Sequence, residues 1–239
     1  MNQHTFVDSA LVTMLLVAPI VEWRWTWPRF LARLVAGVPG TRLRHYRYLL
    51  VGEWLPTLFL VLFWGIRSRP WSALYLTAGA LSLRFWLGLA YVALIIAILL
   101  IQRRALLAKP ERIDRLRKAL AFGEPLLPHT PQERSLFLPV SVAAGVCEEI
   151  FYRGFLTWYL TAWMGLIPAI LIAAILFGLG HVYMGPLQVP KTAFVGLVFA
   201  FVVWLSGSLW PAMLLHAAID WNSGELGYRV FTQPQPSGT

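Results

Sequence analysis

The sequence contains a single cysteine, Cys147, among its 239 residues. A lone cysteine cannot form a disulfide within the chain, and it cannot supply the paired CxxC ligands of a metal knuckle. It is also a poor candidate for a nucleophile, because no activating base stands at a defined spacing from it. We therefore interpret Cys147 as a small packing residue beside Ala143 and Ala144.

Charge is equally scarce. Charged residues make up 13% of the chain and hydrophobic residues 58%, and the mean hydropathy is +0.64. A soluble globule of this size needs more solubilising side chains, so the composition predicts an integral membrane protein surrounded by membrane lipids. The net charge of +9 has no nucleic-acid-binding signature beside it, so we expect no nucleic-acid partner.

Long apolar stretches are what the chain has in abundance. A spanning helix needs about 20 mostly apolar residues, and seven stretches qualify approximately: 7–23, 49–66, 85–102, 136–160, 167–181, 191–206 and 209–222. The predicted fold class is therefore all-α, a polytopic membrane bundle of about seven transmembrane helices. The stretch 70–84 is too short to cross unaided and is predicted to be an extra interfacial or re-entrant helix.

Arginines gather in the loops that follow the first and third predicted spans, within 24–47 and 103–118. Because basic loops remain in the cytoplasm, this pattern predicts an N-terminus outside and a C-terminus in the cytoplasm. The first span lacks a basic n-region and an A-x-A site, so we expect a helix there, and not a cleaved signal peptide. Arginine-rich, lysine-poor loops without an organellar targeting signal favour the inner membrane of a bacterium.

Six ionisable residues interrupt the apolar segments of the C-terminal half: Glu148, Glu149, Arg153, His181, His216 and Asp220. Such groups are costly in hydrocarbon and mark a functional site by default. Helical residues four apart share a face, so Arg153 can neutralise Glu149, and Asp220 lies one turn from His216. Consecutive helical residues point about 100° apart, so the two glutamates cannot have the same role.

Three motifs carry these residues: EExxxR at 148–153, FxxxH at 177–181 and HxxxD at 216–220. In this order on successive spans, they resemble the motifs of the CPBP (CAAX protease and bacteriocin-processing, or ABI-domain) intramembrane proteases, which are glutamic-type peptidases. The resemblance covers residues 136–222, which would form the catalytic core. Residues 1–135 would be N-terminal transmembrane helices with basic loops, and 223–239 a polar tail.

The resemblance implies an intramembrane endopeptidase acting on a membrane-associated or C-terminally tagged protein or peptide, with water as the nucleophile and no cofactor. Carried over by position, Glu148 is the general base that polarises water together with His181. His216 and the residue at position 220 face the developing oxyanion, while Glu149 and Arg153 brace the site.

Asp220 departs from the family pattern, because many relatives have Asn at this position. An ionised carboxylate would repel an oxyanion, so Asp220 is protonated, or it only orients His216, or it belongs to a metal site. Asn222, two residues further on, is an alternative source of the amide.

Two other functions stay open. The HExxH motif of zinc proteases is absent, yet His181, His216, Asp220 and a glutamate could form a ligand set for a divalent metal ion. Alternatively, the ionisable residues serve a transporter or a membrane scaffold. Structural interpretations also exist: Glu149 with Arg153 is a common helix-packing ion pair, and Glu22 and Glu53 are interpreted as interhelical partners or snorkelling groups.

Overall fold

The structure, a computed structural model, describes residues 4–77, 82–108 and 110–232. Its regular elements over these ranges are α1 (Phe6–Val21), the π-helical turn η1 (Glu22–Thr26), α2 (Trp27–Val35), α3 (Thr41–Ile66), the 3-10 turn η2 (Trp71–Leu74), α4 (Leu83–Leu107), α5 (Pro110–Leu120), the 3-10 turn η4 (Glu124–Leu126), α6 (Pro131–Glu149), the π-helical segment η5 (Ile150–Leu156), α7 (Thr157–Met164), α8 (Leu166–Gly180), the 3-10 turn η6 (Val182–Met184), α9 (Gln188–Ser206) and α10 (Leu209–Thr232). The predicted all-α fold class is confirmed.

Within the described ranges, five helical stretches are long and apolar enough to cross a membrane: Phe6–Val35, Thr41–Ile66, Leu83–Leu107, Pro131–Met164 and Gln188–Ser206. The chain is therefore a multi-pass membrane protein. Each of the seven predicted spans lies within a helix, and the two not among these five are in α8, which is apolar but short, and in α10. The predicted helix at 70–84 contains the single turn η2, and its residues 78–81 lie outside the described residues.

Local sequence signals set the ends of the helices that carry the site. At the start of α6, the Thr130 side chain accepts a hydrogen bond from the Glu133 backbone and the Glu133 carboxylate accepts one from the Thr130 backbone, with Pro131 in the first turn. Gly165 between α7 and α8 has φ 81°, and Gly207 after α9 has φ 69°. Both angles suit glycine, so these residues allow the chain to reverse direction between helices.

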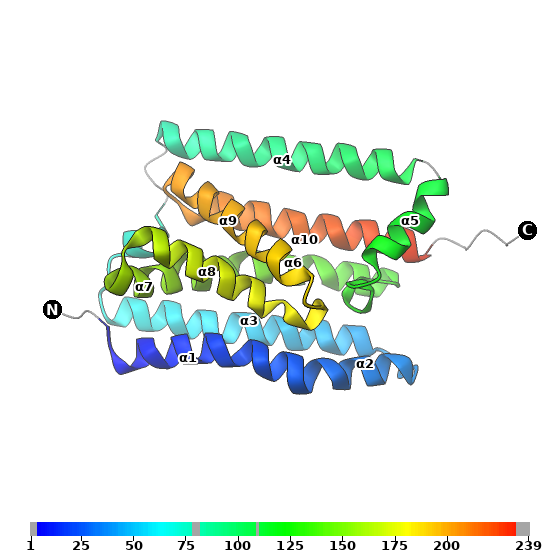
Figure 1. Cartoon of the computed structure of the whole chain (residues 1–239), viewed down its shortest axis with the longest axis horizontal. Coiled ribbons are helices and arrows are strands. Elements are labelled where there is room, and N and C mark those ends of the chain that lie inside the picture. Colours follow the sequence, from blue (N-terminus) through cyan, green and yellow to red (C-terminus); the bar gives the residue numbers. More distant parts are fainter. Residues whose placement is uncertain (1–3, 78–81, 109, 233–239) are drawn as a thin grey trace, which may run out of the picture.

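The helices lie side by side, with α4 at one edge, α1, α2 and α3 at the opposite edge, and α6 and α10 between them (Figure 1). Glycines permit a very close approach of α6 and α10. A Cβ atom on Gly145 would lie 2.7 Å from the Ala217 nitrogen, and one on Gly224 would lie 2.3 Å from the Phe137 ring. We call this contact the α6–α10 seam, and it positions the two helices that carry most of the candidate site.

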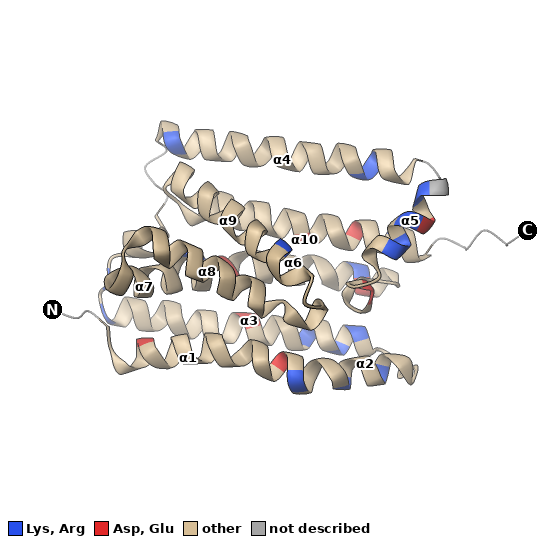
Figure 2. Cartoon of the chain, in the orientation of Figure 1, with Lys and Arg blue, Asp and Glu red and all other residues tan. Residues whose placement is uncertain are grey.

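Basic residues gather at one end of the bundle, where α2, the start of α3, the end of α4 and α5 lie (Figure 2). We call this the basic end. The opposite end carries η2, α7 and the beginnings of α1 and α8 (Figure 1). The C-terminus of α10 also lies at the basic end. The arginine-rich segments of the sequence therefore lie together at one end of the folded bundle.

Candidate active site

The centre of the site is a buried chain of three ionisable side chains from two helices. Oε1 of Glu149 accepts a hydrogen bond from Nη1 of Arg153 at 2.8 Å, and the same oxygen lies 2.8 Å from Nδ1 of His216. The exposed fractions of these side chains are 0% for Glu149, 4% for Arg153 and 5% for His216. The ion pair that the EExxxR spacing predicts is therefore present, and it also fixes an imidazole from α10.

Aromatic rings enclose this chain of charges. The Arg153 guanidinium lies 4.1 Å from the centroid of the Phe177 ring, and the Phe199 ring stacks on His216 with centroids 4.6 Å apart. Phe177 is the first residue of the FxxxH motif, and its side chain is fully buried. The cation–π contact and the ring stacking hold Arg153 and His216 in a single orientation.

Glu148 differs from Glu149 in both exposure and partners. Its side chain is 19% exposed, and its Oε2 lies 3.9 Å from Nε2 of His216. Asp220, with a 37% exposed side chain, approaches the same nitrogen at 3.7 Å. Because a carboxylate oxygen can only accept, Nδ1–H of His216 donates to Glu149, and Nε2 is directed toward Glu148 and Asp220.

The backbone changes its helical form directly after these glutamates. Residues Ile150–Leu156 adopt π-helical turns, in which each backbone N–H bonds five residues back, and all seven residues are buried. Such turns inside a longer helix often occur at functional sites. Here the π-helical segment carries Arg153 toward Glu149 while α6 and α7 continue on either side of it.

His181 caps the C-terminus of α8 and reaches the site from a third helix. Its Nδ1 lies 2.9 Å from the Phe177 carbonyl oxygen, which can only accept, so Nδ1 carries the proton. His181 interacts electrostatically with Asp220. Within the described residues it has no direct hydrogen bond to Glu148 or His216. Its connection to the site is the electrostatic interaction with Asp220 and the Phe177 ring, which lies against both His181 and His216.

One carboxylate of the N-terminal half also faces the site. Glu53, in the middle of α3, interacts electrostatically with Glu148 and Asp220, although α3 lies outside the three motifs. From the sequence alone, Glu53 is interpreted as an interhelical partner or a snorkelling group, because it belongs to no motif. Its one usable signal was a carboxylate in the middle of an apolar span, which points to function by default.

The sequence left open whether Asn222 replaces Asp220 at the site and whether the site holds a divalent metal ion. The Oδ1 atom of Asn222 is buried without a hydrogen-bond partner, whereas Asp220 is the residue that faces His216. Over the described ranges, no three His, Cys, Asp or Glu side chains are grouped so that they could hold a metal ion.

Comparison with known families adds an independent observation. Residues 130–222 match the family described as Rce1-like, type II CAAX prenyl endopeptidase Rce1-like. The resemblance to CAAX proteases is thereby confirmed, and the enzyme is a hydrolase. No curated protein and no solved structure matches the chain. The Rce1-like segment holds all six predicted site residues, whereas Glu53 lies outside it.

Proposed function

We propose that the chain cleaves a peptide bond of a membrane-associated protein with a water molecule that Glu148 activates. The observation that carries this proposal is the difference between two adjacent glutamates. Glu149 is fully buried and bonded to Arg153 and His216. The Glu148 side chain is partly exposed, and its buried Oε2, which has no hydrogen-bond partner, faces Nε2 of His216. A carboxylate with an unpaired oxygen on a partly exposed side chain is able to bind and deprotonate water, and a fully buried carboxylate paired with an arginine and a histidine is not.

In the proposed reaction, Glu148 accepts a proton as the water oxygen attacks the carbonyl carbon of the scissile bond. The carbonyl electrons move to oxygen and form a tetrahedral oxyanion. When the C–N bond breaks, Glu148 returns the proton to the leaving amine. The products are a carboxylic acid and an amine, so one water molecule is consumed and no cofactor is required.

The two histidines have complementary parts in this proposal. Glu149 holds Nδ1–H of His216, so a protonated Nε2 can donate a hydrogen bond to the oxyanion. The Phe177 carbonyl holds Nδ1–H of His181, which leaves Nε2 of that ring as an acceptor for the attacking water. Asp220 orients His216 and stabilises its positive charge.

We propose substrates with a lipid-modified C-terminal tail, because the family that residues 130–222 match is named for prenyl endopeptidases. The test uses the purified full chain in liposomes and a fluorogenic C-terminal CAAX peptide, with and without a farnesyl group on its cysteine. We expect cleavage of the farnesylated peptide to be about tenfold or more faster, because the lipid places the peptide in the bilayer. Equal cleavage of both peptides would contradict the substrate class without contradicting hydrolysis.

The same assay separates the proposed mechanism from zinc-dependent proteolysis. We expect the rate after treatment with EDTA or 1,10-phenanthroline to stay within about twofold of the untreated rate, because Glu148 activates water directly. Loss of cleavage on chelation, restored by adding zinc, would contradict the proposed mechanism and support a metal site.

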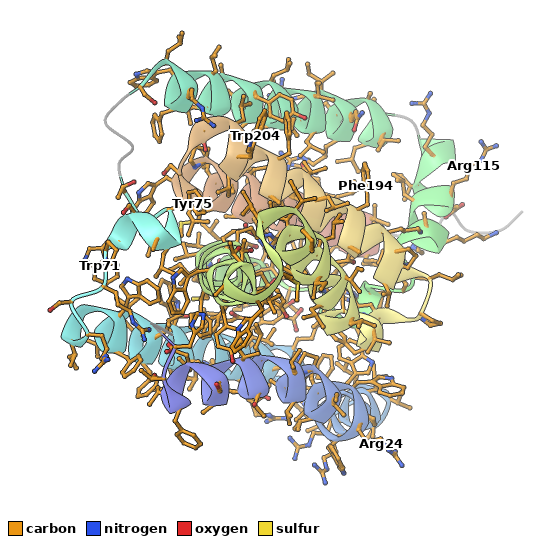
Figure 3. The ribbon with its side chains drawn as sticks, turned by 60° about the vertical axis from the view of Figure 1, so that its left-hand side comes forward. Arg24, Trp71, Tyr75, Arg115, Phe194 and Trp204 are labelled. Carbon is orange, nitrogen blue, oxygen red and sulfur yellow. The ribbon has the colours of Figure 1, made fainter. Side chains whose placement is uncertain are left out.

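We also propose that the basic end faces the cytoplasm of a bacterial cell, as the positive-inside rule predicts. Arg115 on α5 projects away from the bundle at this end (Figure 3). The natural cysteine Cys147 is fully buried, so an Arg115→Cys variant offers one accessible thiol. We expect a membrane-impermeant maleimide to label this variant in inside-out vesicles and not in intact spheroplasts. The reverse pattern would place the basic end outside.

A further inference from the structure

Arginines of α4, α6 and α10 gather around a glutamate at the basic end of the bundle (Figure 2). Arg134, in the first turn of α6, forms a bidentate ion pair with Glu225 of α10, with nitrogen–oxygen distances of 2.5 and 2.8 Å. Arg103, near the end of α4, interacts electrostatically with Glu225 and with three further arginines, which are Arg104, Arg134 and Arg229. We call these four arginines the arginine cluster.

The arginine cluster carries an excess of positive charge. Over the ranges that the structure describes, four positive charges and the one negative charge of Glu225 leave it a net charge of +3. The side chain of Arg134 is 46% exposed, and Arg104 and Arg229 are also exposed. Guanidinium groups that outnumber the carboxylates beside them are available to a phosphate group, because its oxygens match their planar fork.

Two aromatic rings lie against the cluster. The guanidinium of Arg103 lies 5.0 Å from the centroid of the Trp221 ring, and that of Arg134 lies 5.1 Å from the centroid of the Tyr228 ring. Trp and Tyr are enriched where the hydrocarbon of a bilayer meets its headgroups. The rings therefore place the cluster at the depth of the lipid headgroups.

The outer face of α4 changes from apolar to basic within one turn at this point. Ile98 and Ile101 are 44% and 65% exposed, and Arg104, three residues after Ile101, is exposed as well. Because helical residues three apart share a face, the exposed isoleucines lead directly to an exposed guanidinium. A phospholipid has the same order of parts, with acyl chains in the hydrocarbon and a phosphate at the interface.

The cluster lies on the other side of α10 from the candidate active site. Glu225 follows His216 by about two and a half helical turns, so the two side chains leave α10 in opposite directions. His216 bonds Glu149 of α6, whereas Trp221 faces Arg103 of α4. A ligand at the arginine cluster would therefore not touch the groups proposed for peptide hydrolysis.

We propose that the arginine cluster binds the phosphate of an anionic phospholipid from the leaflet at the basic end. The headgroup would accept hydrogen bonds from the exposed guanidinium groups of Arg104 and Arg229, and an acyl chain would lie along Ile98 and Ile101. A site with excess positive charge favours an anionic lipid over a zwitterionic one, whose ammonium group the arginines repel. This site does not depend on the proposed peptidase mechanism.

The test measures equilibrium binding of phosphatidylglycerol and of phosphatidylcholine with the same acyl chains to the purified full chain in an uncharged detergent. We expect saturable binding of phosphatidylglycerol, and binding of phosphatidylcholine at least about tenfold weaker. Inorganic phosphate, which has the charge and no chains, should also bind at least about tenfold more weakly than phosphatidylglycerol. Equal affinity for the two lipids, or for phosphatidylglycerol and inorganic phosphate, would overturn the proposal.

Matched variants distinguish a defined site from general attraction to a basic surface. Arg104→Gln/Arg229→Gln removes two charges from the cluster and leaves the bidentate ion pair between α6 and α10 in place, so we expect the affinity for phosphatidylglycerol to fall at least about tenfold. Arg29→Gln/Arg33→Gln removes two exposed charges from α2, at the opposite edge of the bundle, and should change the affinity by less than about twofold. Equal losses in the two variants would show that only the overall charge of the basic end attracts lipid, and the proposed site would be wrong.

Discussion

Replacing Glu148 with Gln should lower the rate of peptide cleavage by about 10²–10⁴-fold, the range that a positioned general base contributes. Gln has nearly the same shape and can still bind water, but it cannot accept a proton. Because Glu148 has no strong ion pair and is 19% exposed, we expect the variant to fold normally. The measurement is single-turnover cleavage of the lipidated peptide, with circular dichroism and thermal unfolding as checks on the fold.

The matched control is Asp114→Asn on α5, which also removes one carboxylate but one that is 56% exposed and remote from the site. It should cleave at the normal rate. If Glu148→Gln cleaved the peptide at the normal rate, Glu148 would not be the general base. The difference in exposure between Glu148 and Glu149 would then have no role in catalysis.

Replacing Arg153 with Met should destabilise the fold by about 3–5 kcal/mol, because it leaves the carboxylate of Glu149 buried without its cation. The loss should appear as a large decrease in thermal unfolding temperature in detergent. Activity should fall as well, because Arg153 holds the same Glu149 oxygen that accepts from Nδ1 of His216. The double variant Glu149→Gln/Arg153→Met removes both charges, so we expect it to recover much of the stability and none of the activity.

A second buried ion pair provides the control for this experiment. Asp8 and Arg69 lie 2.7 Å apart between α1 and the end of α3, away from the site. Arg69→Met should also lower stability, but molecules that remain folded should cleave peptide at the normal rate. If the Glu149 and Arg153 double variant were fully active, these two residues would be a packing pair with no part in catalysis.

The sequence predicts local pairings well because a helix fixes which residues share a face. The spacing of four residues predicted the contact of Glu149 with Arg153, and Asp220 indeed lies near His216. The bond between His216 and Glu149 was beyond reach, because it joins residues 67 positions apart and depends on how α6 packs on α10. Spacing within one helix carries no information about the rotation of another.

Glu53 shows the same limit, because its contacts with the site also join separate helices. Its approach to Glu148 and Asp220 results from the packing of α3 against α6, and no sequence motif records that contact. Whether α10 spans the membrane also depends on its packing against other helices, and not on its composition alone. The helix α10 carries His216, Asp220 and Glu225 and is less apolar than the five long candidates, yet it packs along α6 between the outer helices.

The α6–α10 seam has a consequence for how a peptide gains entry. The backbones of α6 and α10 touch at Gly145, and the Phe137 ring of α6 packs on Gly224 of α10, so neither point leaves a gap for an acyl chain or a layer of water. We therefore expect these two helices to move as one rigid body. A path for the peptide from the bilayer must therefore open by motion of the surrounding helices relative to the fixed α6–α10 pair. The turnover rate would then depend on how fast the surrounding helices move, while Glu148 on α6 and His216 on α10 keep their relative positions throughout the cycle.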